Sequence, residues 1–355
     1  MGSRRGPHRG ATVLKNLHPV FAEKCLMKLL QVTLLAVMFT VVFMVAASYA
    51  VVIETVPVGN LGNLPDPGNG YGAVNYAYSI GKTEVTISQY SEFLNAVDPT
   101  GVDVLDLWNG TSGLKNKIPL TPTAADGSKY GVKAGKENFP VTFVDWYDTI
   151  RFANWLHNGQ GSGDTETGAY TLLGGTPEPT DGNLIERNPG AQWFVASEDE
   201  WYKAAHHKND GDTANYWNYP TASDTLPTAE EAPGGTNSAN YGAALNALRA
   251  VGSYVDSLSP YGTLDQAGNT NELTDTISTS GNTFRVLKGG SAWLSSTFVH
   301  KNTWTNPSSH SLGGGGERAE GFRVATAIPV PEPGLGVLLA LGTACLLLVR
   351  RSFSR

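Results

Sequence analysis

The chain has 355 residues, of which 41% are apolar and 16% charged, so it can fold around a substantial core. Its 41 glycines and 20 prolines interrupt the backbone often, which argues against helical bundles and coiled coils. The net charge is −7 and no stripe of basic residues occurs in the middle of the chain, so we expect no nucleic-acid partner.

The first 50 residues carry the pattern of a secretory signal peptide. Residues 29–47 form an almost uninterrupted apolar run that follows lysines, and Ser48 and Ala50 are small residues at the positions that signal peptidase reads. We expect a mature protein that begins near Val51, from a signal that starts at Met27. The alternative is an uncleaved membrane anchor, because the run is just long enough to span a bilayer.

Both cysteines of the chain lie in its terminal segments, as Cys25 and Cys345. The part expected to fold, residues 51–327, therefore has no thiol. This excludes disulfides, cysteine–zinc sites, iron–sulfur clusters and thiol nucleophiles from that part.

Three capping residues predict helix N-termini in the middle of the chain. Thr86 and Ser197 are each followed three residues later by Gln or Glu, and Asp145 precedes an apolar helical face that begins with Trp146. Short β-type runs complete a mixed pattern, which predicts one α+β domain with few regular elements. These runs are residues 78–80, 139–143, 284–287 and 322–325.

The C-terminal residues 328–355 combine three features in a fixed order. A Pro-Glu-Pro triplet at residues 331–333 precedes an apolar run at residues 334–349, and a cluster of arginines follows. This order resembles the PEP-CTERM sorting signal of Gram-negative bacteria. The resemblance implies a transmembrane helix that holds an exported protein in the inner membrane, positive end inside, until an exosortase cuts near the triplet. A plain membrane anchor is the alternative.

The middle of the chain also contains seven collinear motifs. They are residues 80–86 (IGKTEVT), 140–146 (PVTFVDW), 197–201 (SEDEW), 237–241 (NSANY), 259–265 (SPYGTLD), 286–291 (VLKGGS) and 321–323 (GFR). In this order they resemble the sulfatase-modifying-factor family, whose founding activity is formylglycine generation, over most of residues 74–326. The resemblance implies the C-type-lectin-like α+β fold of formylglycine-generating enzymes, which has little regular secondary structure.

The family's activity needs residues that this chain lacks. Formylglycine-generating members hold copper with two cysteine thiolates between the sixth and seventh motifs, and residues 291–320 contain no cysteine. Cu(I) prefers soft sulfur ligands. We therefore expect neither bound copper nor the family's oxidase activity.

The family's structural calcium sites are partly retained. Calcium prefers six to eight oxygen ligands from carboxylates and carbonyls, and the loop of residues 265–272 offers such groups. The resemblance implies side-chain oxygens from Asp265 and Glu272, and main-chain oxygens from Gly268 and Thr270. The alternative is a polar turn without an ion.

A second calcium site would use Asn240 and the carbonyl of Tyr241. The acidic partner that the family pattern places downstream is missing from residues 242–251. The second site is therefore less well supported than the first.

The segment after the sixth motif also offers candidate ligand-binding residues. In enzymatic relatives this segment forms the active-site groove, so its aromatic and basic side chains could line a cleft for an extracellular glycan or peptide. Burial in the core is the alternative. The candidates are Trp293, His300, Lys301, Trp304 and Arg323.

Together these patterns predict an exported domain, first tethered to the inner membrane and then located at the cell surface or in the extracellular matrix. We expect it to act as a calcium-stabilised binding or structural protein without catalytic cysteines. One alternative is an enzyme that uses the same groove with non-thiol metal chemistry. Another is residual sulfatase-maturing activity.

Overall fold

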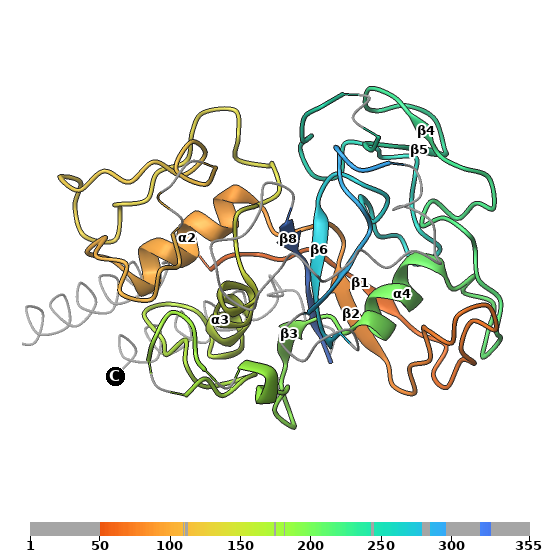
Figure 1. Cartoon of the computed structure of the whole chain (residues 1–355), viewed down its shortest axis with the longest axis horizontal. Coiled ribbons are helices and arrows are strands. Elements are labelled where there is room, and N and C mark those ends of the chain that lie inside the picture. Colours follow the sequence, from red (N-terminus) through yellow and green to blue (C-terminus); the bar gives the residue numbers. More distant parts are fainter. Residues whose placement is uncertain are drawn as a thin grey trace, which may run out of the picture. The chain divides into compact units, whose positions relative to one another are not determined.

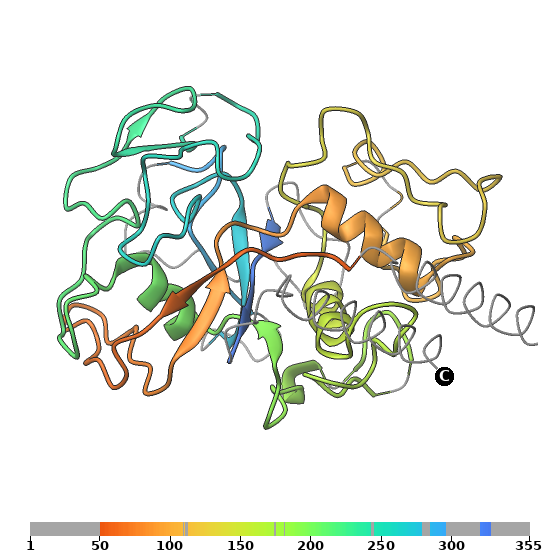
Figure 2. The same ribbon diagram turned by 180° about the vertical axis from the view of Figure 1, so that it is seen from behind.

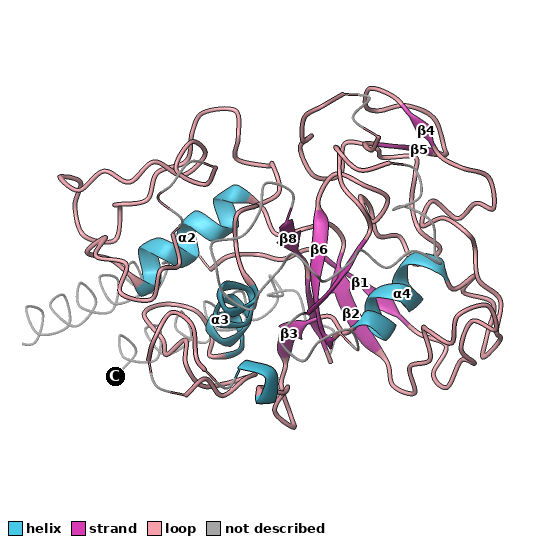
Figure 3. Ribbon diagram, in the orientation of Figure 1, coloured by secondary structure: helices cyan, strands magenta, loops and turns pink. Residues whose placement is uncertain are grey.

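The computed structural model describes residues 50–108, 110, 113–173, 175–180, 182–242, 245–278, 285–295 and 320–327. The described residues from Val51 onward belong to one compact unit, in which short strands and helices are joined by long loops (Figure 3). The predicted α+β class and loop-rich character are confirmed. Within these ranges, no helix is long and apolar enough to cross a membrane. The predicted signal peptide and the predicted helix at residues 334–349 lie outside the described residues.

The three predicted helix N-termini are confirmed. The helices are α2 (Ile87–Val97), α3 (Trp146–His157) and α4 (Glu198–His206). The N-cap side chains of Thr86, Asp145 and Ser197 each accept a hydrogen bond from the backbone N–H three residues later, and the side chain of that residue accepts one from the N-cap N–H. These reciprocal bonds satisfy N–H groups that have no partner inside the helix.

The strands form two main sheets and one short pair. The first sheet is antiparallel throughout, with the order β1 (Thr55–Val58), β2 (Tyr78–Gly81), β9 (Val324–Thr326) and β3 (Trp193–Val195). The second has the order β7 (Arg285–Lys288), β6 (Asn271–Ile277) and β8 (Glu320–Phe322). In it β6 runs antiparallel to β7 and parallel to β8. Outside these sheets are the parallel pair β4 (Thr228–Ala229) and β5 (Ser238–Ala239), and a 3₁₀ turn, η1 (Gly182–Leu184).

The single strand predicted over residues 322–325 is divided between the two sheets. β8 ends at Phe322 and β9 begins at Val324, so the chain leaves one sheet and enters the other at Arg323. The predicted run at residues 284–287 corresponds to β7, although residue 284 lies outside the described part of the chain.

The strand predicted over residues 139–143 is wrong. Only Pro140 pairs there, in an isolated antiparallel bridge with Thr86. Phe143 has φ of 65°, which lies in the left-handed region that a β-strand cannot contain. The segment still contributes to the fold, because the N–H of Val141 donates to the carbonyl of Val85 at 2.8 Å.

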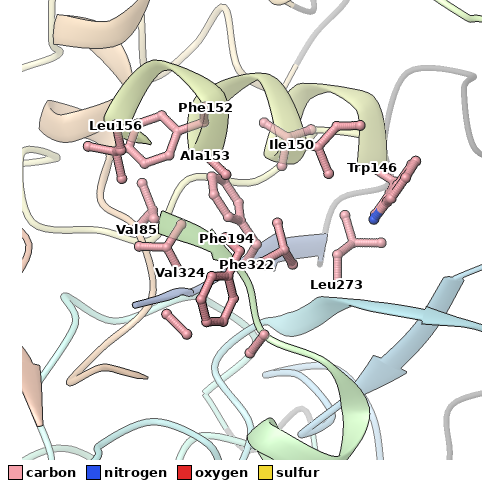
Figure 4. Packing of buried hydrophobic residues seen from close by; sticks show 14 of the residues in the cluster. Val85, Trp146, Ile150, Phe152, Ala153, Leu156, Phe194, Leu273, Phe322 and Val324 are labelled. Carbon is pink, nitrogen blue, oxygen red and sulfur yellow. The ribbon is translucent and has the colours of Figure 1, made fainter. Parts of the chain in front are cut away.

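Helix α3 lies at the centre of the core rather than on its surface. Its side chains pack over Phe194 of β3, Phe322 of β8 and Val324 of β9, as Figure 4 shows. The rings of Phe152 and Phe322 meet edge to face with centroids 5.4 Å apart. Every residue of the helix from Trp146 to Leu156 is buried, including the polar ones.

Two views of this unit show how the second sheet is covered. Strands β6 and β8 lie between α2 and α3 on one side and α4 on the other (Figures 1 and 2). The predicted calcium loop, residues 265–272, leads into β6 and ends within its first two residues. Helix α4 therefore lies next to the strand that this loop enters.

Candidate functional site

A buried ion pair joins β6 to the crossing point between the sheets. Nε of Arg323 donates to Oε2 of Glu272 and Nη2 donates to Oε1, both at 2.5 Å. Both side chains are 1% exposed. The indole N–H of Trp201, on α4, also donates to Oε2 of Glu272, at 2.7 Å. Three hydrogen bonds thus converge on the Glu272 carboxylate, two of them from a guanidinium whose geometry matches it.

The remaining donors of Arg323 hold two loops. Nη1 donates to the carbonyl of Gly81 at 2.9 Å, and Nη2 donates to the carbonyl of Leu264 at 3.0 Å. Arg323 therefore ties the end of β2 and the start of the predicted calcium loop to β6. The prediction that Arg323 lines a ligand groove is wrong, because the side chain is fully buried and its donors are used within the core.

Two further carboxyl groups belong to the same cluster. Glu84, in the loop after β2, is 1% exposed, and its Oε1 accepts a hydrogen bond from Nδ2 of Asn269 at 3.1 Å. Its Oε2 has no hydrogen-bond donor among the described residues. The carboxyl group of Asp265, whose charge acts on Glu84, accepts the N–H of Gly252 at 2.6 Å.

The cluster has more acidic groups than basic ones. Burial, together with the charges of Asp265 and Glu272, raises the pKa of Glu84 well above its usual value. Burial raises the pKa of Asp265 to about 6, against the N–H of Gly252 and the charge of Arg323, which lower it. Within the described part of the chain, three carboxylates face one guanidinium, so full ionisation leaves an excess of two negative charges. Buried charge of this kind requires a proton or a cation to neutralise it.

Glu84 and Asn269 were not among the residues singled out from the sequence. The sequence could have pointed to Glu84 only through its place in the first motif, where this carboxyl group is next to apolar residues. Asn269 lies inside the predicted calcium loop, but its side chain reaches Glu84 across 185 residues of sequence. Such a contact leaves no local pattern.

The predicted calcium ligands fit a cation only in part. Oε2 of Glu272 already accepts two hydrogen bonds and Oε1 accepts one, so this carboxylate has little capacity left. No group of three or more His, Cys, Asp or Glu side chains among the described residues is arranged to hold a metal ion. A calcium ion at this loop would therefore need main-chain oxygens such as those of Gly268 and Thr270, which suit its preference for many oxygen ligands.

The second predicted calcium site lies next to the first. Asn240 is 1% exposed, and its Oδ1 has no hydrogen-bond donor in the described part of the structure. Its Nδ2 donates to Oδ1 of Asn269 at 3.2 Å, and its carbonyl accepts the N–H of Asn269 at 2.8 Å. Tyr241 is buried, and its hydroxyl donates to the carbonyl of Pro227. Asn269 thus connects both predicted sites, and Asn240 offers a buried oxygen that a cation could use.

Most of the predicted ligand groove lies outside the described residues. This applies to His300, Lys301 and Trp304. Trp293 is described and is half-buried. The ligand groove therefore stays a prediction, and Arg323 is no longer one of its lining residues.

A cavity of about 490 Å³ borders the charge cluster. Thr83, Gly252 and Leu264 line it, and these residues are neighbours of Glu84 and Asp265 in sequence or by hydrogen bond. Exposed residues also belong to its lining, so solvent reaches it. The full lining is Glu54, Lys82, Thr83, Asn138, Ala250, Val251, Gly252, Val255, Leu258 and Leu264.

Three solved structures can be aligned with most of this chain. Treponema denticola variable protein 1 is 20% identical, with 79% of this chain and 96% of that chain covered and a TM-score of 0.47. CarF is 20% identical, with 78% and 99% covered and a TM-score of 0.48. PvdO from Pseudomonas aeruginosa is 18% identical, with 78% and 92% covered and a TM-score of 0.41. No curated protein matches the chain significantly.

The family comparison is specific. Residues 71–328 match the model of the sulfatase-modifying factor enzyme 1-like domain. The matched range includes all seven motifs and every member of the charge cluster. The chain therefore belongs to the sulfatase-modifying factor enzyme 1-like domain family.

Proposed function

We propose that this protein is a non-catalytic member of its family that serves as an exported binding or structural domain. The observation that carries the proposal is the combination of a family domain over residues 71–328 with the absence of any cysteine between residues 51 and 327. Thiolates are the soft ligands that the family's copper chemistry requires. A chain that keeps the scaffold without them has lost the means to bind Cu(I) in that way.

The motif residues support a structural role. Glu84, Trp201, Asp265 and Arg323 come from four different motifs, and all four take part in the buried cluster around Glu272. The motifs therefore have a function in holding the fold, independent of catalysis. Loops on such a rigid frame can vary and bind ligands.

We propose calcium as the stabilising ion of this frame. Support comes from the excess of negative charge at Glu84, Asp265 and Glu272, and from the buried oxygen of Asn240 that lacks a donor among the described residues. When bound, calcium would supply positive charge and link the loop's oxygens. Asp265 and the carbonyls of Gly268 and Thr270 are the groups that would hold it.

The terminal patterns support export and surface attachment. An exosortase-type enzyme and the inner membrane would be the first partners, and an extracellular glycan or peptide would be the ligand. Trp293, His300, Lys301 and Trp304 are the residues proposed to contact it. Cell fractionation, with the full chain detected by an internal tag, tests this part: protein confined to the cytoplasm would contradict it.

Metal analysis and a maturation assay test the non-catalytic proposal. Full-length protein is purified and its metal content measured, and we expect calcium without iron or copper. Near one equivalent of iron or copper would instead favour an enzyme with non-thiol metal chemistry. In parallel, a sulfatase peptide is co-expressed and examined by mass spectrometry. Conversion of its cysteine to formylglycine above the level in cells without the protein would overturn the proposal.

A further inference from the structure

We infer that Gln160 is the binding site for the N-terminus that signal peptidase would create at Val51, so that the first residue of the exported protein is held in the fold by its main chain. This inference rests on the proposed export. It gives Gln160 and Gln89 a role that the family comparison does not assign. The ligand of the site is a segment of the same chain, namely Val51 and Val52.

The first step is the pairing of Gln160 with Val51. The N–H of Val51 donates to Oε1 of Gln160 at 2.6 Å, and Nε2 of Gln160 donates to the carbonyl of Val51 at 2.8 Å. One amide side chain thus matches both main-chain groups of a residue that lies 109 positions away. From the first turn of α2, Nε2 of Gln89 donates to the carbonyl of Val52 at 3.0 Å. Two amide side chains therefore fix the first two residues of this segment.

The second step is that the segment belongs to the fold from Val51 onward. Val51 and Ile53 are half-buried and pack against the main hydrophobic core, whereas Val52 between them is 75% exposed. Such alternation is typical of an extended chain with one face on the core. The small residues that signal peptidase reads place the cut between Ala50 and Val51 on independent grounds. The predicted cleavage site and the start of the packed segment therefore coincide.

The third step is the backbone conformation of Gln160. It lies in the loop after α3 with φ of 66°, between Gly159 with φ of 82° and Gly161 with φ of 69°. Its N–H donates to the carbonyl of Trp155 at 2.8 Å. Glycine adopts such a φ without strain, whereas a residue with a Cβ does so at a cost. A glutamine in this position indicates a task for its side chain, and the pairing with Val51 is such a task.

The chemistry of the site suits a free α-amine. After the cut, Val51 carries an ammonium group with three N–H donors. One of them donates to Oε1 of Gln160 in a charge-assisted hydrogen bond, and the half-buried position leaves the others to water. The carbonyl of Val51 keeps its hydrogen bond from Nε2 of Gln160.

The test uses the full chain, expressed in a Gram-negative host, with the exported protein purified and its first residue identified by mass spectrometry. The α-amine is then labelled with 2-pyridinecarboxaldehyde, which reacts with N-termini, in the wild type and in Gln160→Gly. We expect Val51 as the first residue and labelling about tenfold faster in the variant, because two hydrogen bonds of ordinary net strength are lost. If Gln160 served only the turn, glycine would leave the labelling rate unchanged. Thermal unfolding confirms that both proteins are folded at the labelling temperature.

A matched control is Asn246→Gly, because Asn246 is an exposed amide residue with φ of 49°. It should label at the rate of the wild type. Exported protein with a first residue other than Val51, or with equal labelling in the wild type and Gln160→Gly, would overturn the inference while the proposed export stands. Protein confined to the cytoplasm would overturn both. Should Gln160→Gly not fold, Gln160→Asn decides in the same way, because asparagine tolerates a positive φ and its amide is one methylene shorter.

Discussion

Arg323 and Glu272 form a bidentate ion pair although 51 residues separate them in sequence. Arg323 is the single residue between β8 and β9, and Glu272 lies near the start of β6. The pair therefore fastens the point where the chain crosses from one sheet to the other. Its loss should loosen both sheets at once.

Replacing Arg323 by Met is expected to lower the free energy of unfolding by about 3–5 kcal/mol, since a buried carboxylate loses its partner. Urea denaturation measures the loss. The control is Arg249→Met, which removes an ion pair to the exposed Glu231 and should cost less than about 1 kcal/mol. Equal losses of unfolding free energy in the two variants would show that the buried ion pair stabilises the protein no more than the exposed one.

Gly268 is expected to tolerate no side chain. It has φ of +89°, and a Cβ there would lie 2.2 Å from the carbonyl oxygen of Asn240. We predict that Gly268→Ala lowers the free energy of unfolding by about 3 kcal/mol or more, because overpacking adds to the backbone strain. Gly135→Ala isolates the strain, since Gly135 has φ of +77° and nothing within 4 Å; it should cost about 1–2 kcal/mol. A similar cost for both variants would refute the predicted close contact.

The helix starts could be predicted because they depend on neighbouring residues. Each cap joins residues three apart, so the pattern is visible in the sequence. The family motifs likewise identified the fold. By contrast, the charge cluster depends on contacts such as that of Arg323 with Gly81, which are 242 residues apart. No local pattern records such a contact.

Helix α3 shows a second limit of prediction from sequence. Its apolar spacing predicts one buried face, yet the polar residues are buried too, because the loop that follows the helix supplies partners for Arg151 and Asn154. Arg151 pairs with Glu166 at 2.7 Å, and the side chain of Asn154 donates to the carbonyls of Thr165 and Tyr170. Polar residues on a helix normally indicate a solvated face, so the sequence favoured the wrong environment here.

Glu200 should stabilise the protein only while it is ionised. Burial opposes its charge, but the guanidinium of Arg187 and hydrogen bonds from Tyr76 and Ser197 outweigh burial and lower the pKa of Glu200. A pKa that is lower in the folded state means that the stabilisation is present above the unfolded pKa and is lost as pH falls through the folded one. We expect Glu200→Gln to be less stable than the wild type near neutral pH.

Guanidinium chloride unfolding of Glu200→Gln and the wild type, measured from neutral pH down to about pH 3, checks this. The difference in stability between them should shrink as the pH falls through the pKa of Glu200 in the folded state. Glu54→Gln serves as the control, because Glu54 pairs with Lys82 at an exposed position and its effect should stay below about 1 kcal/mol throughout. A constant difference for Glu200→Gln would contradict the prediction.

Lys117 should produce a dependence of the same sign at alkaline pH. Burial, with a smaller effect of Lys136, lowers its pKa from 10.5 to about 8, and its Nζ donates to Thr142 Oγ1 at 2.6 Å. Between these two pKa values the unfolded chain binds more protons than the folded one, so the contribution of Lys117 to stability rises with pH. Relative to Lys117→Met, the wild type should therefore gain stability from about pH 8 to 10.5. Lys115→Met, at an exposed neighbouring position, serves as the control for the loss of a lysine. A difference between the wild type and Lys117→Met that does not change with pH would contradict the prediction.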